Sequence, residues 1–174
     1  LPRAVDARNA YITRSVMREV IEHGTAWTQL SASGSPLLKR GDLGGKTGTT
    51  NEARDAWFAG IHPKIAATVW VGFDDHRRPL GKVEYGGKAA LPIWQFFMET
   101  ALANEPVAPD TPPPGVATAR IDPLNGLLAP AGFPGSFMEV FLAEQVPTQM
   151  TPRAGEDQPD PQKPQTAPAN DDIF

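Results

Sequence analysis

The chain has 174 residues, of which 40% are hydrophobic and 21% charged, so it can form one domain with a packed core. Its formal net charge of −4 argues against a nucleic-acid partner or an anionic membrane surface, because no net basic field attracts either. The lack of cysteine excludes disulfides, thiolate metal sites and a cysteine nucleophile. No apolar run approaches the roughly 18–20 residues needed to cross a bilayer, so we expect no membrane contact from this segment itself. The opening has neither an initiator methionine nor a signal peptide, which is typical of a fragment.

The first predicted element is a helix within residues 6–24. Asp6 or Asn9 could cap its start, and Gly24 could end it. Its apolar residues recur on one helical face: Ile12, Val16, Met17, Val20 and Ile21. The stretch that follows, residues 28–45, is rich in Ser, Gly and Pro and predicts a loop.

Residues 44–50 predict a short strand, and residues 55–75 predict two more, joined at His62-Pro63-Lys64. So short a connection makes that pair antiparallel. Both faces of the second strand of the pair are mostly apolar, which is typical of a strand buried on both sides.

A polar loop then leads to a second helix within residues 89–106, with Pro92 in its first turn and Pro106 past its end. We expect this helix to cover one face of the sheet with a side formed by Ile93, Phe96, Phe97, Thr100 and Ala101. Core packing is likewise the expected role of the chain's main aromatic residues: Trp57, Phe58, Trp70, Trp94, Phe96 and Phe97.

The C-terminal part differs in composition, since 14 of the 19 prolines follow residue 104. Asn125-Gly126 predicts a small hairpin. We therefore divide the chain into a folded part (1–104), a small extension (105–150) and a disordered, proline-rich tail (151–174).

The stretch GDLGGKTGTT, residues 41–50, has two interpretations. A phosphate-binding loop ending at Gly45-Lys46-Thr47 needs its first glycine at position 40, which is Arg40, and needs a buried strand before it and a helix after it. Neither neighbouring segment fits. The alternative is an extended edge strand that binds a peptide by strand addition, with Lys46 as the positive charge and glycines that permit close approach. Regular alternation would then point Lys46 and Gly48 to one face and Thr47 and Thr49 to the other.

Three consecutive stretches carry a family resemblance: GKTGTTNEARDAWFAGIHP, IAATVWVGFDD and GGKAALPIWQFFMETAL. Together with flanking matches between residue 3 and about residue 149, they resemble the C-terminal part of the transpeptidase domain of class A penicillin-binding proteins. The resemblance implies an α+β fold, an antiparallel sheet flanked by helices as in β-lactamases and transpeptidases, of which this chain holds the C-terminal portion.

In that family a serine of a Ser-x-x-Lys motif attacks the D-Ala-D-Ala end of a peptidoglycan stem peptide, and β-lactams acylate the same serine. No cofactor takes part. The resemblance gives Lys46 the electrostatics around a Ser-x-Asn motif, and Thr47 and Thr49 the binding of the substrate carboxylate. The amide of Thr49 would be an oxyanion-hole donor. Gly48 and Thr50 would complete the substrate-binding strand.

The chain departs from the family pattern because it contains neither Ser-x-x-Lys nor Ser-x-Asn. We expect these motifs on upstream polypeptide, which would be this segment's partner beside stem peptides and β-lactams. The family also implies an upstream glycosyltransferase domain and an anchor that holds the enzyme at the periplasmic face of the cytoplasmic membrane. Two alternatives stay open: a non-catalytic peptidoglycan-binding or scaffold homologue, and a serine β-lactamase.

Two smaller features complete the sequence-based expectations. Asp74, Asp75 and His76 could suggest metal ligands, but adjacent polar residues after a strand are more typical of a solvated turn, so we expect no metal. Arg54 and Asp55 could pair to fix the loop that leaves the Lys-Thr-Gly strand.

Overall fold

A computed structural model describes residues 4–152 of the chain. These residues form two compact units, the first made of residues 4–117 and 140–144 and the second of residues 118–139 and 145–152. Within residues 4–152, no helix combines the length and the apolar character needed to cross a membrane.

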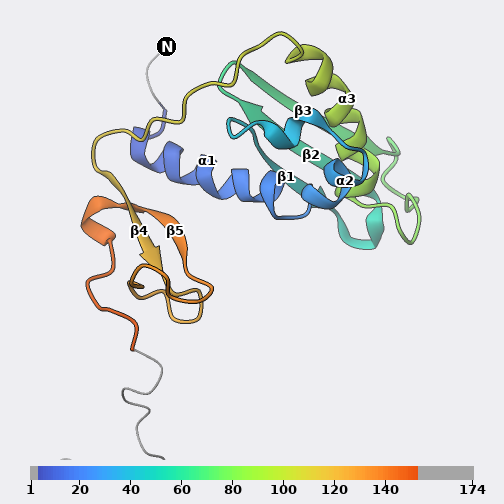
Figure 1. Cartoon of the computed structure of the whole chain (residues 1–174). Coiled ribbons are helices and arrows are strands. Elements are labelled where there is room, and N and C mark those ends of the chain that lie inside the picture. The colour runs from blue at the N-terminus through green and yellow to red at the C-terminus, as the bar shows by residue number, and fades with distance from the viewer. Residues whose placement is uncertain (1–3, 153–174) are drawn as a thin grey trace, which may run out of the picture. The chain divides into compact units, whose positions relative to one another are not determined.

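The centre of the first unit is a three-stranded antiparallel sheet in the order β1-β2-β3 (Figure 1). Its strands are β1 (Gly44–Thr49), β2 (Asp55–His62) and β3 (Ile65–Gly72). The predicted strands and their tight connection are confirmed, since His62 pairs with Ile65 across a two-residue turn. Because β1 pairs with β2 alone among the described strands, the Lys-Thr-Gly segment is an edge strand.

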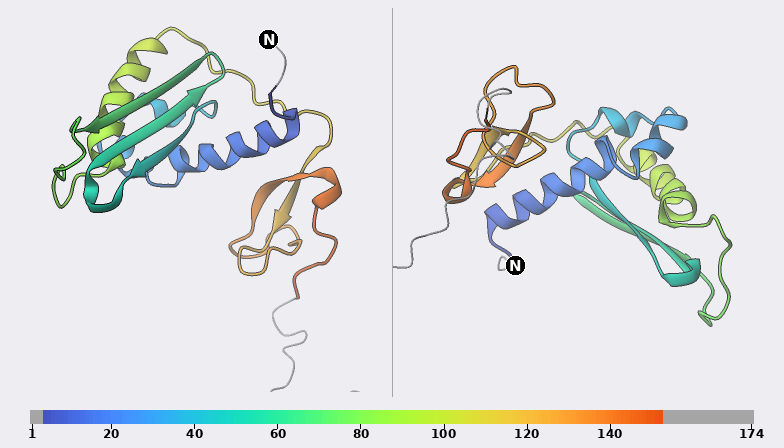
Figure 2. Two further views of the ribbon diagram at one scale, coloured as in Figure 1. Left: turned by 180° about the vertical axis from the view of Figure 1, so that it is seen from behind. Right: turned by 90° about the horizontal axis from the view of Figure 1, so that it is seen from below.

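Two long helices lie against this sheet, α1 (Ala7–Glu22) and α3 (Leu91–Ala101), as both views of Figure 2 show. A side chain at Gly44 would meet Met17 of α1, and one at Gly60 would meet the Trp94 ring of α3. Gly60 pairs with Gly45, so these two residues face the same side of the sheet. Gly44 is the sequence neighbour of Gly45 and therefore faces the other side. The helices therefore approach the sheet from opposite sides.

The predicted first helix is confirmed, with Asp6 as its cap through a 3.0 Å hydrogen bond from the Arg8 amide. Of its predicted apolar face only Ile21 is fully buried, whereas Val16 is exposed. The prediction of loop for residues 28–45 is wrong in part. The short helix α2 (Trp27–Ala32) and a 3₁₀ turn (Pro36–Lys39) form there, because Leu30 and Leu37 enter the core.

The predicted second helix is also confirmed, but its predicted inner face is wrong. Leu91, Trp94 and Met98 are buried, whereas Ile93, Phe96 and Phe97 are exposed. The sequence of α3 is apolar around most of its circumference, so periodicity alone did not separate the two faces. The core lies between α3, the sheet, α2 and the 3₁₀ turn, with the Phe58 and Trp94 rings 4.8 Å apart between centroids.

Two further burial predictions need correction. Strand β3 is not buried on both faces, because Ala66, Thr68 and Trp70 are exposed while the alternate residues are partly buried. Only some of the aromatic residues predicted to be in the core are buried. Phe58 and Trp94 are core residues, as predicted, whereas Trp57, Trp70, Phe96 and Phe97 are exposed.

Strands β4 (Val116–Ile121) and β5 (Phe137–Leu142) form a two-stranded sheet. The predicted turn at Asn125-Gly126 is confirmed, with Gly126 at φ +72° and an antiparallel bridge between Ile121 and Leu128. Thr151, the first residue of the predicted tail, is buried and donates a 2.7 Å hydrogen bond to Asp122. The rest of that tail, from residue 153, lies outside the described residues. The division at residues 104 and 105 stays a prediction about domains, although residues 105–117 belong to the first compact unit.

Candidate functional site

The candidate site is the edge strand β1 with the segments that touch it. Its register against β2 is continuous from Gly44–Ile61 to Thr49–Ala56. No bulge therefore re-aims a side chain within the strand, and Lys46 and Gly48 share one face while Thr47 and Thr49 share the other, as alternation predicts. This extended geometry contradicts the phosphate-loop interpretation, because Lys46 lies inside a strand where no helix begins, and the element before β1 is the 3₁₀ turn Pro36–Lys39 and not a strand.

Lys46 is exposed, and its ammonium group donates a 2.8 Å hydrogen bond to the carbonyl oxygen of Thr47. The lysine side chain thus folds back along the strand. A single accessible ammonium group beside unpaired backbone groups suits a peptide or an anion that approaches the sheet edge.

Thr47 and Thr49 have different neighbours on their shared face. The Thr47 hydroxyl lies 3.4 Å from the hydroxyl of Thr25, in the segment between α1 and α2. The Thr49 hydroxyl accepts a 3.1 Å hydrogen bond from the backbone amide of Gly86, just before α3. Three segments that are distant in sequence therefore meet around this face.

Thr50 and Asp55 close the turn that leaves β1. The Asp55 amide donates to the Thr50 hydroxyl at 2.8 Å, and that hydroxyl lies 3.3 Å from the Asp55 carboxylate. The same carboxylate accepts from the Trp70 indole at 2.9 Å and contacts His76 Nδ1 at 3.2 Å. The indole hydrogen bond and the nearby imidazole lower the pKa of Asp55 despite partial desolvation.

The predicted pairing of Arg54 with Asp55 is wrong. Arg54 pairs with Glu52 and donates to the His76 carbonyl at 3.2 Å, whereas Asp55 faces Trp70. Glu52 and Ala53 have left-handed φ values of +60° and +50°, so the turn is conformationally strained. A shallow hollow of about 450 Å³ lies beside it, lined by Thr50, Asn51, Glu52, Arg54, Asp55 and His76.

The sequence analysis did not identify Asp55 as a central residue, although the register of the β2–β3 hairpin indicates that it lies beside Trp70. The two-residue turn pairs Asp55 with Gly72 and Trp57 with Trp70. Asp55 and Trp70 are therefore diagonal neighbours on one face, within reach of a long side chain.

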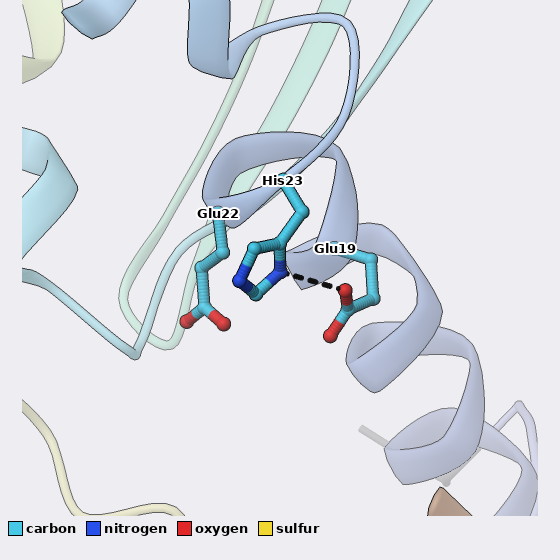
Figure 3. Close-up of side chains that lie close together, drawn as sticks. All are labelled: Glu19, Glu22 and His23. Carbon is cyan, nitrogen blue, oxygen red and sulfur yellow. Dashed lines mark hydrogen bonds and ion pairs between the residues drawn. The ribbon is translucent and has the colours of Figure 1, made fainter. Parts of the chain in front are cut away.

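The residues considered for a metal site do not come together as a ligand set. Among the described residues, possible metal-ligand side chains come close together at Glu19, Glu22 and His23, whose possible ligand atoms lie within 4.8 Å of one another (Figure 3). His23 Nδ1 lies 2.9 Å from Glu19 Oε2, which is an ordinary pair one helical turn apart on the surface of α1. Asp75 and His76 serve other contacts, since Asp75 accepts from the Arg77 amide at 3.1 Å and His76 faces Asp55.

No family model matches the chain, but the relatives found among known proteins belong to one kind. Penicillin-binding protein 1A of Pseudomonas aeruginosa is 46% identical over 145 residues, which are 83% of this chain and 17% of that protein. Penicillin-binding protein 1A of Escherichia coli is 38% identical over 161 residues, or 85% of this chain and 19% of that protein.

Among solved structures, the crystal structure of penicillin-binding protein 1A from Haemophilus influenzae superimposes with a TM-score of 0.76 and 38% sequence identity. The match covers 86% of this chain and 22% of that one. The shared α+β fold confirms the expected fold class, and the chain spans about a fifth of the length of the relatives that it matches.

Proposed function

Because this chain belongs to the class A penicillin-binding proteins, we propose that its strand β1 is one wall of a D,D-transpeptidase site that cross-links peptidoglycan. The observation that carries this proposal is the position of Lys46, Thr47 and Thr49 on an unpaired sheet edge. An extended stem peptide can add to such an edge through main-chain hydrogen bonds. No cofactor is needed, because the reaction is acyl transfer through a serine ester.

Each residue of the strand has a chemical role in this proposal. Lys46 supplies positive charge to the nucleophile and its neighbours. The hydroxyls of Thr47 and Thr49 bind the terminal carboxylate of the substrate, or the equivalent carboxylate of a β-lactam. The Thr49 amide stabilises the developing oxyanion, a role worth about 100- to 1000-fold in rate in other acyl-transfer enzymes. Gly48 permits close approach of the substrate backbone, and Thr50 fixes the end of the strand.

The serine nucleophile lies, in this proposal, on polypeptide upstream of Leu1, since the 174 residues contain no Ser-x-x-Lys. Two surfaces support such a partner. Trp57, Trp70 and Thr68 leave one face of the hairpin exposed, and α3 exposes the side that carries Ile93, Phe96 and Phe97. Exposed apolar surface of this kind typically marks an interaction site. We place the whole enzyme at the periplasmic face of the cytoplasmic membrane, with an upstream anchor and an upstream glycosyltransferase domain.

The test is covalent labelling of the intact protein with a fluorescent penicillin. We expect stable labelling of the wild type and a loss of about 100-fold or more in the acylation rate for Lys46→Ala, because the site loses its cation. Lys64→Ala is the matched control, since Lys64 is an exposed lysine in the β2–β3 turn that pairs with Glu105. Equal rates for Lys46→Ala and the wild type would exclude the proposed role of Lys46.

The same experiment separates the alternatives. A scaffold homologue would not be labelled at all. A serine β-lactamase would be labelled transiently and would release hydrolysed antibiotic, whereas a transpeptidase stays acylated.

A further inference from the structure

The segment just before α3 makes an unusually close approach to the Lys-Thr-Gly strand. Gly86 lies over the β1–β2 pair, so that a side chain at this position would fall 2.3 Å from the carbonyl oxygen of Trp57 and 2.6 Å from that of Gly48. Both atoms are backbone and cannot move without displacing a strand. Only glycine fits here, because the backbone of one segment touches the backbone of the other.

This approach delivers one hydrogen bond to the candidate site, from the buried Gly86 amide to the exposed Thr49 hydroxyl at 3.1 Å. Gly86 begins a π-helical turn, Gly86–Ala90, in which the Leu91 amide donates to the Gly86 carbonyl. The amide of the first residue of a helical turn has no partner within the helix, so it is available to the threonine.

The bond determines what the Thr49 hydroxyl can offer to a ligand. A hydroxyl has one proton to donate and two lone pairs to accept with. The Gly86 amide occupies one lone pair, and no acceptor for the hydroxyl proton of Thr49 lies among the described residues. A carboxylate can only accept hydrogen bonds, so it fits the group that remains. Polarisation along the chain from amide to hydroxyl to carboxylate strengthens the second bond.

We infer that Gly86 is a positioning residue that fixes the Thr49 hydroxyl as a hydrogen-bond donor and thereby sets the preference of the site for a carboxylate-bearing substrate. This inference rests on the proposed function, in which Thr49 contacts the substrate carboxylate. Thr47 lacks this arrangement, because its hydroxyl contacts the Thr25 hydroxyl at 3.4 Å and not a backbone amide. The two threonines of the strand are therefore not equivalent.

The experiment compares acylation of the intact protein by a fluorescent penicillin and by the methyl ester of the same compound. The ratio of the two second-order rate constants measures carboxylate preference and is insensitive to a general loss of active protein. For Gly86→Ala we expect this ratio to fall roughly 10- to 100-fold, the range for one hydrogen bond to a charged group. Gly87→Ala is the matched control. Its new methyl group would meet the exposed Tyr85 ring at 3.3 Å and no strand backbone.

A double-mutant cycle tests whether Gly86 acts on the carboxylate preference through Thr49. In a Thr49→Val background, Gly86→Ala should change the ratio no further, since both changes remove the same oriented donor. Hydrogen exchange provides a measurement without any glycine variant. The segment around Gly86 should exchange faster in Thr49→Val than in the wild type, and Thr47→Val should leave it unchanged.

Several outcomes would overturn the inference. These are equal slowing of both compounds by Gly86→Ala, additive effects in the Thr49→Val background, or unchanged exchange at Gly86 in Thr49→Val. If the wild type is labelled by neither compound, the proposed function fails and the inference fails with it. A labelled wild type whose preference survives Gly86→Ala removes the inference alone.

Discussion

Asp55 shows how one residue can hold the end of the candidate strand. Its carboxylate joins the Thr50 hydroxyl, the Trp70 indole and the His76 imidazole, which come from three different segments. The sequence predicted that this turn needs fixing, but it named Arg54 as the partner. Arg54 lies before β2 with helical backbone angles, and its guanidinium reaches Glu52 and the His76 carbonyl instead of Asp55. The identity of the partner depends on the hairpin register, which a composition-based interpretation does not use.

We expect Asp55→Asn to lower the melting temperature of the intact protein and to slow its acylation by penicillin. Asparagine can keep its oxygen opposite Trp70 and His76, which both contact Oδ1, but it then places an amide donor opposite the Thr50 hydroxyl, which donates to Oδ2, and it loses the negative charge. The pKa of Asp55 is lowered from 3.8, so the ionised carboxylate stabilises the folded state. That contribution is complete above the ordinary pKa and is lost as the pH falls through the lowered folded-state pKa.

Thermal melts at a series of pH values check this expectation. The difference between wild type and Asp55→Asn should be constant above about pH 5 and shrink in the acid range. Asp74→Asn, in the exposed turn after β3, is the control. A difference that grows as the pH falls would contradict the assigned ionisation of Asp55.

At the scale of elements, the sheet was predictable and the orientation of α3 was not. Apolar runs bounded by turn residues identify β2 and β3, and a two-residue connection leaves only an antiparallel pairing. Helix α3 carries large apolar residues on both sides, so its buried face depends on where Gly60 leaves room. Trp94 occupies the space above that glycine, which fixes Leu91 and Met98 inward and Phe96 outward.

The exposed side of α3 leads to a prediction about the intact protein. Phe96 is 75% exposed in this chain, yet we expect Phe96→Ala to destabilise the intact protein by roughly 3–5 kcal/mol, as for a core phenylalanine. The reason is the proposed contact of this side with upstream polypeptide. Val83→Ala, in the exposed loop before α3, should change stability by less than about 0.5 kcal/mol.

Urea unfolding of the intact protein measures both values. A cost for Phe96→Ala as small as that for Val83→Ala would show that nothing covers this side of α3.

At the scale of the whole molecule, buried polar contacts connect segments that lie far apart in the sequence. Asp42, just before β1, accepts from Arg40 at 2.8 and 3.0 Å and from the Ala108 amide at 2.7 Å. His62, at the end of β2, lies 3.2 Å from the same carboxylate. Burial raises the pKa of Asp42, but the bonds from Arg40 and Ala108 outweigh burial and lower it. No periodicity signals such a cluster, because its members come from two loops and the end of a strand, which only the tertiary structure brings together.

This cluster holds the first residues of β1 and the chain after α3 to one end of the sheet, so it should contribute strongly to stability. Asp42→Asn keeps the shape of the side chain but leaves the Arg40 guanidinium, which is 10% exposed, without its counter-charge. We expect the free energy of unfolding at neutral pH to fall by up to roughly 3–5 kcal/mol, the cost of removing one partner of a buried ion pair. Asp75→Asn, in a solvated turn, should have little effect. Urea unfolding checks the stability, and penicillin labelling of the surviving folded protein checks the site, which should stay reactive because Asp42 contacts none of Lys46, Thr47 or Thr49. Wild-type stability in Asp42→Asn would mean that hydrogen bonds, and not charge, hold this end of the sheet.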